Sequence, residues 1–196
     1  ESGNRAATIV SNMLSFSRKT ERKYEYNDLA ELLDKTLELA ANDYNLKKYY
    51  DFRKIDIIRE YDPKMPRIYC DGNEMQQVFL NLLKNGAEAM VEKAYESERP
   101  LFIWRVKQTS SKAVVEITDN GPGIDEATRK RIFEPFFTTK EVGRGTGLGL
   151  SVSYFIVTEQ HKGCLEVDSA PGKWTRFTIT LPLAEEPPHD ASYPDS

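Results

Sequence analysis

Residues 71–90 read DGNEMQQVFLNLLKNGAEAM, and this stretch decides the fold. Its apolar side chains recur at helical spacing, at Met75, Val78, Phe79, Leu82 and Leu83. This spacing predicts one long helix that buries a continuous face. Asp71 and Glu74 stand three residues apart, which is the spacing of a capping box, so we expect the helix to begin directly after Asp71.

The segments on either side of this helix predict a second structural layer. Upstream, Asn27 or Asp28 can cap another helix, whose apolar face runs from Leu29 to Ala40. A third helix is expected after Gly147, where an apolar stripe follows a glycine-rich run. The segments that read as strands are residues 54–60, 66–70, 101–107, 113–119, 164–169 and 175–182. We expect an α+β fold, a two-layer sandwich in which about three helices cover one face of a mixed sheet.

The ends of the chain differ from this central domain, which we place at residues 24–183. Residues 6–16 form an amphipathic stripe too short for a stable lone helix, so the stripe needs either a second chain or its own domain as a partner. Residues 184–196 have the composition of a flexible tail.

Composition excludes several classes of protein. A hydrophobic content of 39% in 196 residues is enough for one good core. The net charge of −4 disfavours a nucleic-acid-binding surface. Cys70 and Cys164 are expected to be reduced thiols, and we find neither a signal peptide nor a membrane-spanning segment, so the chain is expected to be soluble.

Two asparagines on the long helix are candidate ligands. Asn81 and Asn85 stand one helical turn apart, so both carboxamides project from one side of the helix. An asparagine oxygen suits Mg²⁺, which takes few protein ligands and completes its shell with water and phosphates. Alternatively, the two side chains form hydrogen bonds across the core.

A carboxylate ends the strand predicted over residues 113–119. Asp119 shares the parity of Val115 and Ile117, which predicts that it faces the core. Gly121 and Gly123 follow it in a turn that leaves room for a flat ligand. Asp119 either accepts a hydrogen bond from an exocyclic amine such as that of adenine or closes an Asx turn with its own loop.

Glycines recur at every second position from Gly143 to Gly149. Backbone amides there, together with the start of a helix, favour phosphate binding. The run has neither the Gly-Lys-Ser/Thr ending of a Walker A loop nor the preceding strand of a dinucleotide fingerprint. Lys140 and Arg144 lie in a polar segment that is expected to bring positive charge to the phosphates.

Four motifs in this order make the chain recognisable. NLLKNGAEAM, DNGPGI, FEPFFTTK and GTGLGLS resemble the N, G1, F and G2 motifs of the ATP-binding domain of bacterial sensor histidine kinases. The resemblance covers residues 24–183 and implies the ATP-binding sandwich shared with gyrase, Hsp90 and MutL. Residues 1–23 resemble the end of the second helix of that family's dimerisation and phosphotransfer hairpin.

The resemblance implies a binding site for ATP with Mg²⁺. Asn85 matches the Mg²⁺ ligand, Asp119 matches the residue that reads adenine, and Thr178 is expected to help hold the base through water. Phe133, Phe136 and Phe137 match aromatic anchors of a lid or, alternatively, pack in the core. The full set implied for ATP binding is Asn81, Asn85, Glu88, Asp119, Gly121, Gly123, Ile124, Lys140, Arg144, Gly145, Thr146, Gly147, Leu148, Gly149, Leu150 and Thr178.

Two positions depart from the family pattern. Gly86 replaces the usual alanine, which lowers helix propensity by about 1 kcal/mol without touching the ligands. Some relatives carry a lysine where this chain has Glu88, so phosphate charge must be balanced by Mg²⁺, Lys140 and Arg144.

The resemblance implies an enzyme that transfers the γ-phosphate of ATP to a histidine, for relay to the aspartate of a response-regulator receiver domain. That histidine lies on the first helix of the hairpin and has no counterpart here; His161 and His189 do not replace it. We therefore expect no catalytic residue and no autophosphorylation in this chain alone. A homodimer through the dimerisation helices and a cytoplasmic location for this portion are also implied.

Two other functions stay open. A hydrolytic ATPase of the same superfamily would carry a general-base glutamate at position 81, where this chain has Asn81. A non-catalytic nucleotide-binding or dimerisation module is the second alternative.

Overall fold

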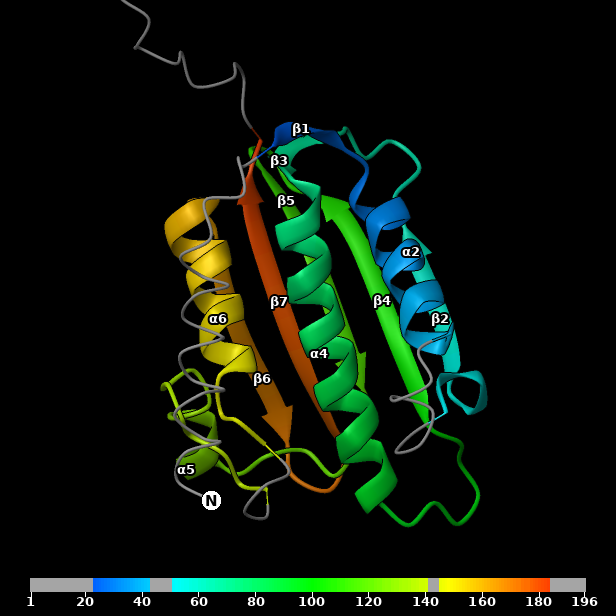
Figure 1. The fold of residues 1–196 in the computed structure, drawn as a ribbon. Helices are drawn as coiled ribbons and strands as arrows, with labels where there is room; N and C mark the ends of the chain where they lie inside the picture. The colour runs from blue at the N-terminus through cyan, green and yellow to red at the C-terminus, as the bar shows by residue number, and fades with distance from the viewer. Residues whose placement is uncertain (1–22, 43–50, 141–144, 184–196) are drawn as a thin grey trace, which may run out of the picture.

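The computed structural model describes residues 23–42, 51–140 and 145–183, and Figure 1 shows them as two layers, a sheet with helices on one face. The stripe at residues 6–16, Arg144, His189 and the C-terminal tail lie outside these ranges. The predicted α+β sandwich is confirmed.

The described residues form a mixed sheet of five strands in the order β2-β4-β5-β7-β6. Its strands are β2 (Asp56–Tyr61), β4 (Leu101–Gln108), β5 (Lys112–Asp119), β6 (Cys164–Ala170) and β7 (Trp174–Pro182). β2 runs parallel to β4, and the other neighbouring pairs are antiparallel. Because β5 and β7 are antiparallel neighbours, the C-terminal end of β5 lies beside the N-terminal end of β7, with Asp119 opposite Thr175.

Helices α2 (Leu29–Asn42), α4 (Gly72–Glu92) and α6 (Gly149–Phe155) lie side by side on one face of this sheet, with α4 in the middle (Figure 1). A five-residue π-helical turn, η2 (Ile156–Gln160), continues α6. The short helices η1 (Phe52–Lys54) and α5 (Glu126–Arg129) lie in connecting loops. The predicted cap of α2 is Asp28, whose Oδ1 accepts from the backbone N–H groups of Ala30 and Glu31.

The core lies between the helices and the sheet because both layers alternate as the sequence predicts. The buried face of α4 includes Met75, Val78, Phe79 and Leu83, all at most 1% exposed. The inward parity of β4 places Phe102, Trp104 and Val106 against it. The opposite parity points away from the described helices, and it carries charged side chains that pair across strands.

A second small sheet was not predicted. β1 (Tyr24–Asn27) pairs antiparallel with β3 (Ile68–Asp71), so the strand predicted at residues 66–70 lies outside the main sheet. This pairing brings the start of the described chain to the start of α4. The backbone N–H of Lys23 donates to Asp71 Oδ2 at 3.0 Å, while Asp71 Oδ1 accepts from Asn73 and Glu74, as the capping box predicts.

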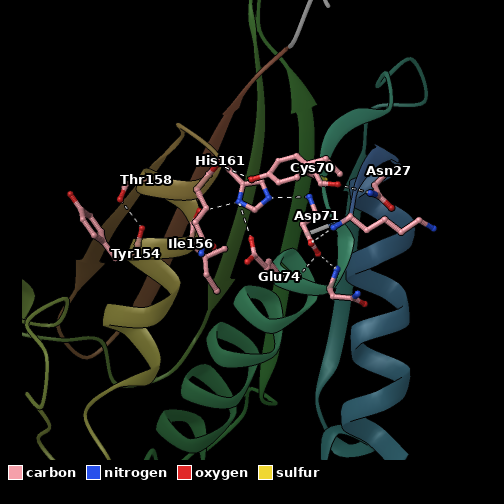
Figure 2. A network of polar contacts seen from close by, with 12 residues as sticks. Asn27, Cys70, Asp71, Glu74, Tyr154, Ile156, Thr158 and His161 are labelled. Atoms are coloured by element: carbon pink, nitrogen blue, oxygen red, sulfur yellow. Dashed lines mark hydrogen bonds and ion pairs between the residues drawn. The ribbon is translucent and has the colours of Figure 1, made fainter. Parts of the chain in front are cut away.

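His161 joins the same network from the far end of η2 (Figure 2). Its Nε2 accepts the backbone N–H of Asp71 at 3.1 Å, and its Nδ1 lies 2.9 Å from the carbonyl of Ile156. Because a backbone N–H can only donate, Nε2 is bare and Nδ1 carries the proton. His161 is therefore a neutral link between the N-terminus of α4 and the end of η2.

Candidate functional site

A cavity of about 460 Å³ lies between α4, the loop of residues 120–140, the start of α6 and the ends of β5 and β7. It collects most of the residues that the sequence singled out, although those that line it run from Asn81 to Leu150 along the chain. The predicted residues that line it are Asn81, Asn85, Glu88, Asp119, Gly123, Ile124, Lys140, Gly145, Thr146, Gly147, Gly149 and Leu150.

Asp119 lies at one end of the cavity and is 4% exposed. Its Oδ1 accepts the backbone N–H of Gly121 at 2.9 Å, so the Asx-turn contact exists. The carboxylate also borders the cavity, so the turn and a ligand contact are compatible. Burial raises the pKa of Asp119 to about 7, against the opposing effects of the Gly121 N–H and of Lys93. A carboxylate held this way gains from a donor on a ligand.

The turn after Asp119 is shaped for close approach. Gly123 has φ +67°, and a Cβ there would lie 2.4 Å from the carbonyl oxygen of Ala170. Gly121 does not line the cavity, and a Cβ there would meet Asp119 Oδ1 at 2.7 Å. Gly123 is therefore required by the backbone of this turn, whereas a side chain at Gly121 would displace the Asp119 carboxylate, whatever ligand the cavity takes.

Lys93, the C-cap residue of α4, binds the backbone of the turn that follows Asp119. Its Nζ donates to the carbonyl oxygen of Asn120 at 2.7 Å and lies over the ring of Tyr95. The hydroxyl of Tyr95 donates to the same carbonyl at 3.2 Å. Neither side chain was predicted, since nothing in the sequence relates residues 93 and 95 to a turn at position 120.

The glycine run forms the other end of the cavity. Gly147 has φ +65°, and a Cβ there would lie 2.4 Å from the backbone carbon of Phe136. The N–H of Phe136 donates to the Gly147 carbonyl at 2.9 Å. Phe136 itself has φ 66°, a strained backbone for a bulky residue. The FEPFF segment is thus bound directly to the glycine run.

The three aromatic residues of that segment have different surroundings. Phe133 stacks against Tyr154 with ring centroids 5.1 Å apart, and Phe137 lines the cavity beneath the guanidinium of Arg131. Phe136 is half exposed. Phe133 and Phe137 pack against the core, whereas Phe136 contacts the glycine run through its backbone.

Asn81 ties α4 to the start of α6. Its Nδ2 donates to the carbonyl of Gly149 and to Ser153 Oγ, each at 3.2 Å. Ser153 is completely buried and also donates to the Gly149 carbonyl. The carboxamide of Asn81 therefore holds the glycine run in place and offers no carboxylate at this position.

Asn85, Glu88 and Lys140 meet at the same end of the cavity. Lys140 Nζ lies 3.3 Å from Asn85 Oδ1 and forms an ion pair with the Glu88 carboxylate. A cationic group therefore already lies against two oxygen donors of α4. Such oxygens fit Mg²⁺, which binds through one or two protein ligands together with substrate phosphates. Within the described ranges, no group of three or more His, Cys, Asp or Glu side chains could hold a metal ion. A metal at Asn85 would therefore need phosphate and water ligands as well.

Three of the predicted residues that the structure describes are not on the cavity surface. Leu148 forms the N-cap position of α6, and Gly121 is hydrogen-bonded to Asp119 without lining the cavity itself. Thr178 lies opposite Glu116 in the ladder and shares the parity of Arg176, so it is on the other face of the sheet. Thr175, at the opposite parity, lines the cavity beside Asp119. Thr175 was not predicted, although it is two residues from Phe177 and therefore shares its face of the strand.

Residues 70–185 match a protein family described as histidine kinase-, DNA gyrase B- and HSP90-like ATPase. Sporulation kinase E of Bacillus subtilis is 35% identical over 92% of this chain and 23% of its own length. Sensor kinase CckA of Brucella abortus is 38% identical over 95% of the chain and 20% of its own length. The chain thus spans about a fifth to a quarter of these curated relatives.

Solved structures give the same result. The nucleotide-free catalytic domain of histidine kinase ThkA superposes with a TM-score of 0.66 and 27% identity, covering 82% of this chain and 98% of that domain. Histidine kinase ThkA in complex with response regulator TrrA superposes with a TM-score of 0.69 and 25% identity, covering 92% of this chain and 48% of the kinase. No helix in the described part of the chain has the length and apolarity needed to cross a bilayer.

Proposed function

The chain belongs to the family of histidine kinase-, DNA gyrase B- and HSP90-like ATPases, and we propose that it is the ATP-binding, phosphoryl-donating portion of a sensor histidine kinase. Residues 24–183 are its catalytic domain, and residues 1–23 end the second helix of a dimerisation hairpin. In this proposal the γ-phosphate of ATP passes to a histidine of that hairpin and then to an aspartate of a response regulator.

One observation carries the proposal: a single cavity has a buried carboxylate at one end and a bound cationic group at the other. Asp119 suits the exocyclic amine of adenine. The glycine run and Lys140 suit the negative triphosphate, which gains from backbone N–H groups and positive charge. Asn85 is placed to bind Mg²⁺, which when bound neutralises charge that develops on the transferring phosphate.

The chain's own residues position ATP for attack. Asp119 and the turn at Gly121 orient the base, while Asn81 fixes the glycine run through Gly149 and Ser153. His161 is buried with both ring nitrogens in hydrogen bonds, so its ring serves as a structural link and is not placed to attack a phosphate. The acceptor imidazole comes from outside the described residues.

The position of Asn81 favours phosphotransfer over hydrolysis. A hydrolytic ATPase needs a base near the γ-phosphate to activate water. Here the neutral carboxamide of Asn81 is engaged by α6. We therefore expect slow ATP turnover by the chain alone.

We also propose the setting in which this domain works. ATP and a receiver domain are its partners, by analogy with histidine kinase ThkA, which forms a complex with response regulator TrrA. The full-length protein acts as a homodimer through the hairpin, and this portion lies in the cytoplasm, where ATP is available.

Radiolabelled ATP tests the proposal. The 196-residue chain should stay unlabelled when it is incubated with γ-labelled ATP and Mg²⁺. A longer polypeptide that carries the proposed histidine hairpin together with Asn85→Ala should gain acid-labile label when this chain is added. Acid-stable label on serine or threonine, or label on His161 of the chain itself, would contradict the proposal.

A further inference from the structure

We propose that the Lys140 ammonium occupies the divalent-cation position of the nucleotide-free site, and that Glu88 is the second protein ligand of the Mg²⁺ that replaces it. This inference rests on the proposed function, because ATP is the ligand that draws Lys140 away. It goes beyond that function by giving the glutamate a role in metal binding.

The first support is the position of the ammonium group. Lys140 Nζ lies 3.3 Å from Asn85 Oδ1 and is paired with Glu88 Oε2, so it lies between a neutral and a charged oxygen. Asn85 and Glu88 are three residues apart on α4, so their side chains share one helical face. Two oxygens that hold one hard cation are suited to hold another.

The second support is the way Lys140 is fixed. Its backbone N–H donates to Thr138 Oγ1 at 3.2 Å, and a Cβ on Gly145 would lie 3.2 Å from Lys140 Cδ. The side chains of Lys140 and Glu88 are each 31% exposed, so the pair is accessible to solvent but partly shielded. A contact of this kind holds Lys140 over α4 until a stronger anion competes for it.

The third support is charge. Besides Glu88 and Asp119, Glu92 also lines the cavity, while the described cations on its surface are Lys84 and Lys140. A triphosphate would meet net repulsion if Glu88 stayed unpaired. A divalent cation bound between Glu88 and the phosphates removes that repulsion and frees Lys140 to contact the triphosphate. The exchange therefore makes ATP and Mg²⁺ binding interdependent.

Mn²⁺ serves as the probe, since its free form is counted directly by electron paramagnetic resonance. Without nucleotide, Lys140→Met should bind Mn²⁺ at least fivefold more tightly than the unchanged chain. The double variant Lys140→Met/Glu88→Gln should lose that gain, because the carboxylate is then missing. Glu92 lines the same cavity, and no described interaction joins it to Lys140. The double variant Lys140→Met/Glu92→Gln should therefore keep the gain in Mn²⁺ affinity.

The Glu88→Gln substitution should have opposite effects on the affinity for the non-hydrolysable ATP analogue AMP-PNP and on the affinity for Mn²⁺. Calorimetry should show metal-free analogue binding severalfold more tightly, since the variant removes a negative charge and releases Lys140. Mn²⁺ should bind the analogue complex about tenfold more weakly.

The outcomes separate this inference from the proposed function. If the unchanged chain binds no adenine nucleotide with or without metal, the proposed function fails. If it binds nucleotide but Lys140→Met gains no Mn²⁺ affinity, or the double variant keeps the gain, or Glu88→Gln leaves Mn²⁺ binding unchanged, the exchange proposal is overturned.

Discussion

Gly86 shows how one residue can reverse an expectation drawn from helix propensity. Because alanine is the better helix former, Gly86→Ala should stabilise α4 by about 1 kcal/mol if nothing else changed. However, a Cβ there would lie 2.6 Å from Phe102 Cε1 and 3.3 Å from Asp119 Cβ. Phe102 is fully buried against Trp104 and cannot move aside cheaply. The glycine is therefore matched to the large ring.

We predict that Gly86→Ala lowers the free energy of unfolding by about 1–2 kcal/mol, since overpacking a core costs more than the propensity gain. In a Phe102→Leu background the same change should become neutral or stabilising. Urea denaturation of the four proteins measures this coupling. Equal effects of Gly86→Ala in both backgrounds would show that the ring is not the obstacle.

Asp119 gives a pH dependence whose sign can be worked out. Its pKa is about 7 in the folded protein and near 3.8 without the fold. Between these values the folded state holds a proton that the unfolded state has released, so stability falls as pH rises from about 4 to 7 and is level above 7. Asp119→Asn lacks this titration, and at pH 8 it should be more stable than the unchanged chain by about 2–4 kcal/mol. Chemical denaturation from pH 5 to 8 measures the difference, and a constant difference across that range would contradict the assignment.

ATP binding should show the opposite trend. If the carboxylate form accepts from adenine, binding releases the proton, and affinity should rise up to tenfold per unit as pH rises toward 7. Phosphate groups of ATP also titrate in this range, so Asp119→Asn is the control that contains only their contribution. Calorimetry in two buffers of different ionisation enthalpy should show proton release for the unchanged chain in excess of the variant.

His161 connects two helices, α4 and α6, whose other residues include several that line the cavity. It joins Asp71, the cap of α4, to Ile156, where α6 becomes η2 (Figure 2). Tyr24 in β1 lies against the same ring and donates its hydroxyl to the Gln160 carbonyl at 2.8 Å. The junction thus fixes the ends of α4 and α6 that are remote from the cavity.

His161→Phe should destabilise the domain by about 1–3 kcal/mol, because it keeps a buried ring but leaves the Asp71 N–H without its acceptor. Hydrogen exchange should show faster exchange of the Asp71 amide. Tyr24→Phe, which keeps the ring and removes the hydroxyl that donates to the Gln160 carbonyl, is the matched comparison and should cost about 1 kcal/mol or less. Unchanged exchange at Asp71 in His161→Phe would mean that the histidine does not hold this amide.

The long helices and strands with a regular apolar pattern were predictable from the sequence, whereas contacts between segments far apart in the chain were not. α4 and α2 follow from their caps and apolar spacing, and strand parity alone placed Asp119 in the core. β1 was missed because YEYN is short and polar, and its pairing with β3 joins segments more than forty residues apart. The ion pair of Lys140 with Glu88 likewise joins separate motifs, and no local pattern encodes it.

At the scale of the whole molecule, the two faces of the sheet have different uses. Helices cover one face of the sheet (Figure 1), and the core and the cavity lie on that side. The other face carries paired charges such as Arg105 with Glu60 and Lys107 with Glu116. Thr178, which the sequence analysis placed in the site, lies on the charged face, and Thr175 lies on the cavity side. Strand parity explains this difference, because Thr178 is an odd number of residues from Thr175 and therefore faces the opposite side of the sheet.

Nucleotide binding should therefore depend on one face only. Saturation with ATP and Mg²⁺ at a hundred times the dissociation constant should stabilise the chain by about 2.7 kcal/mol and raise its melting temperature by roughly 5–10 °C.

Thr175→Val should weaken ATP binding about fivefold and reduce that shift in melting temperature, because it removes a hydroxyl beside Asp119. Thr178→Val makes the same isosteric change on the same strand but on the other face, and it should leave the shift intact. GTP should stabilise the unchanged chain less, since guanine presents a carbonyl oxygen where adenine presents an amine to Asp119. Thermal unfolding with each nucleotide decides the matter: a larger loss from Thr178→Val than from Thr175→Val would place the base on the wrong side of the sheet for this site.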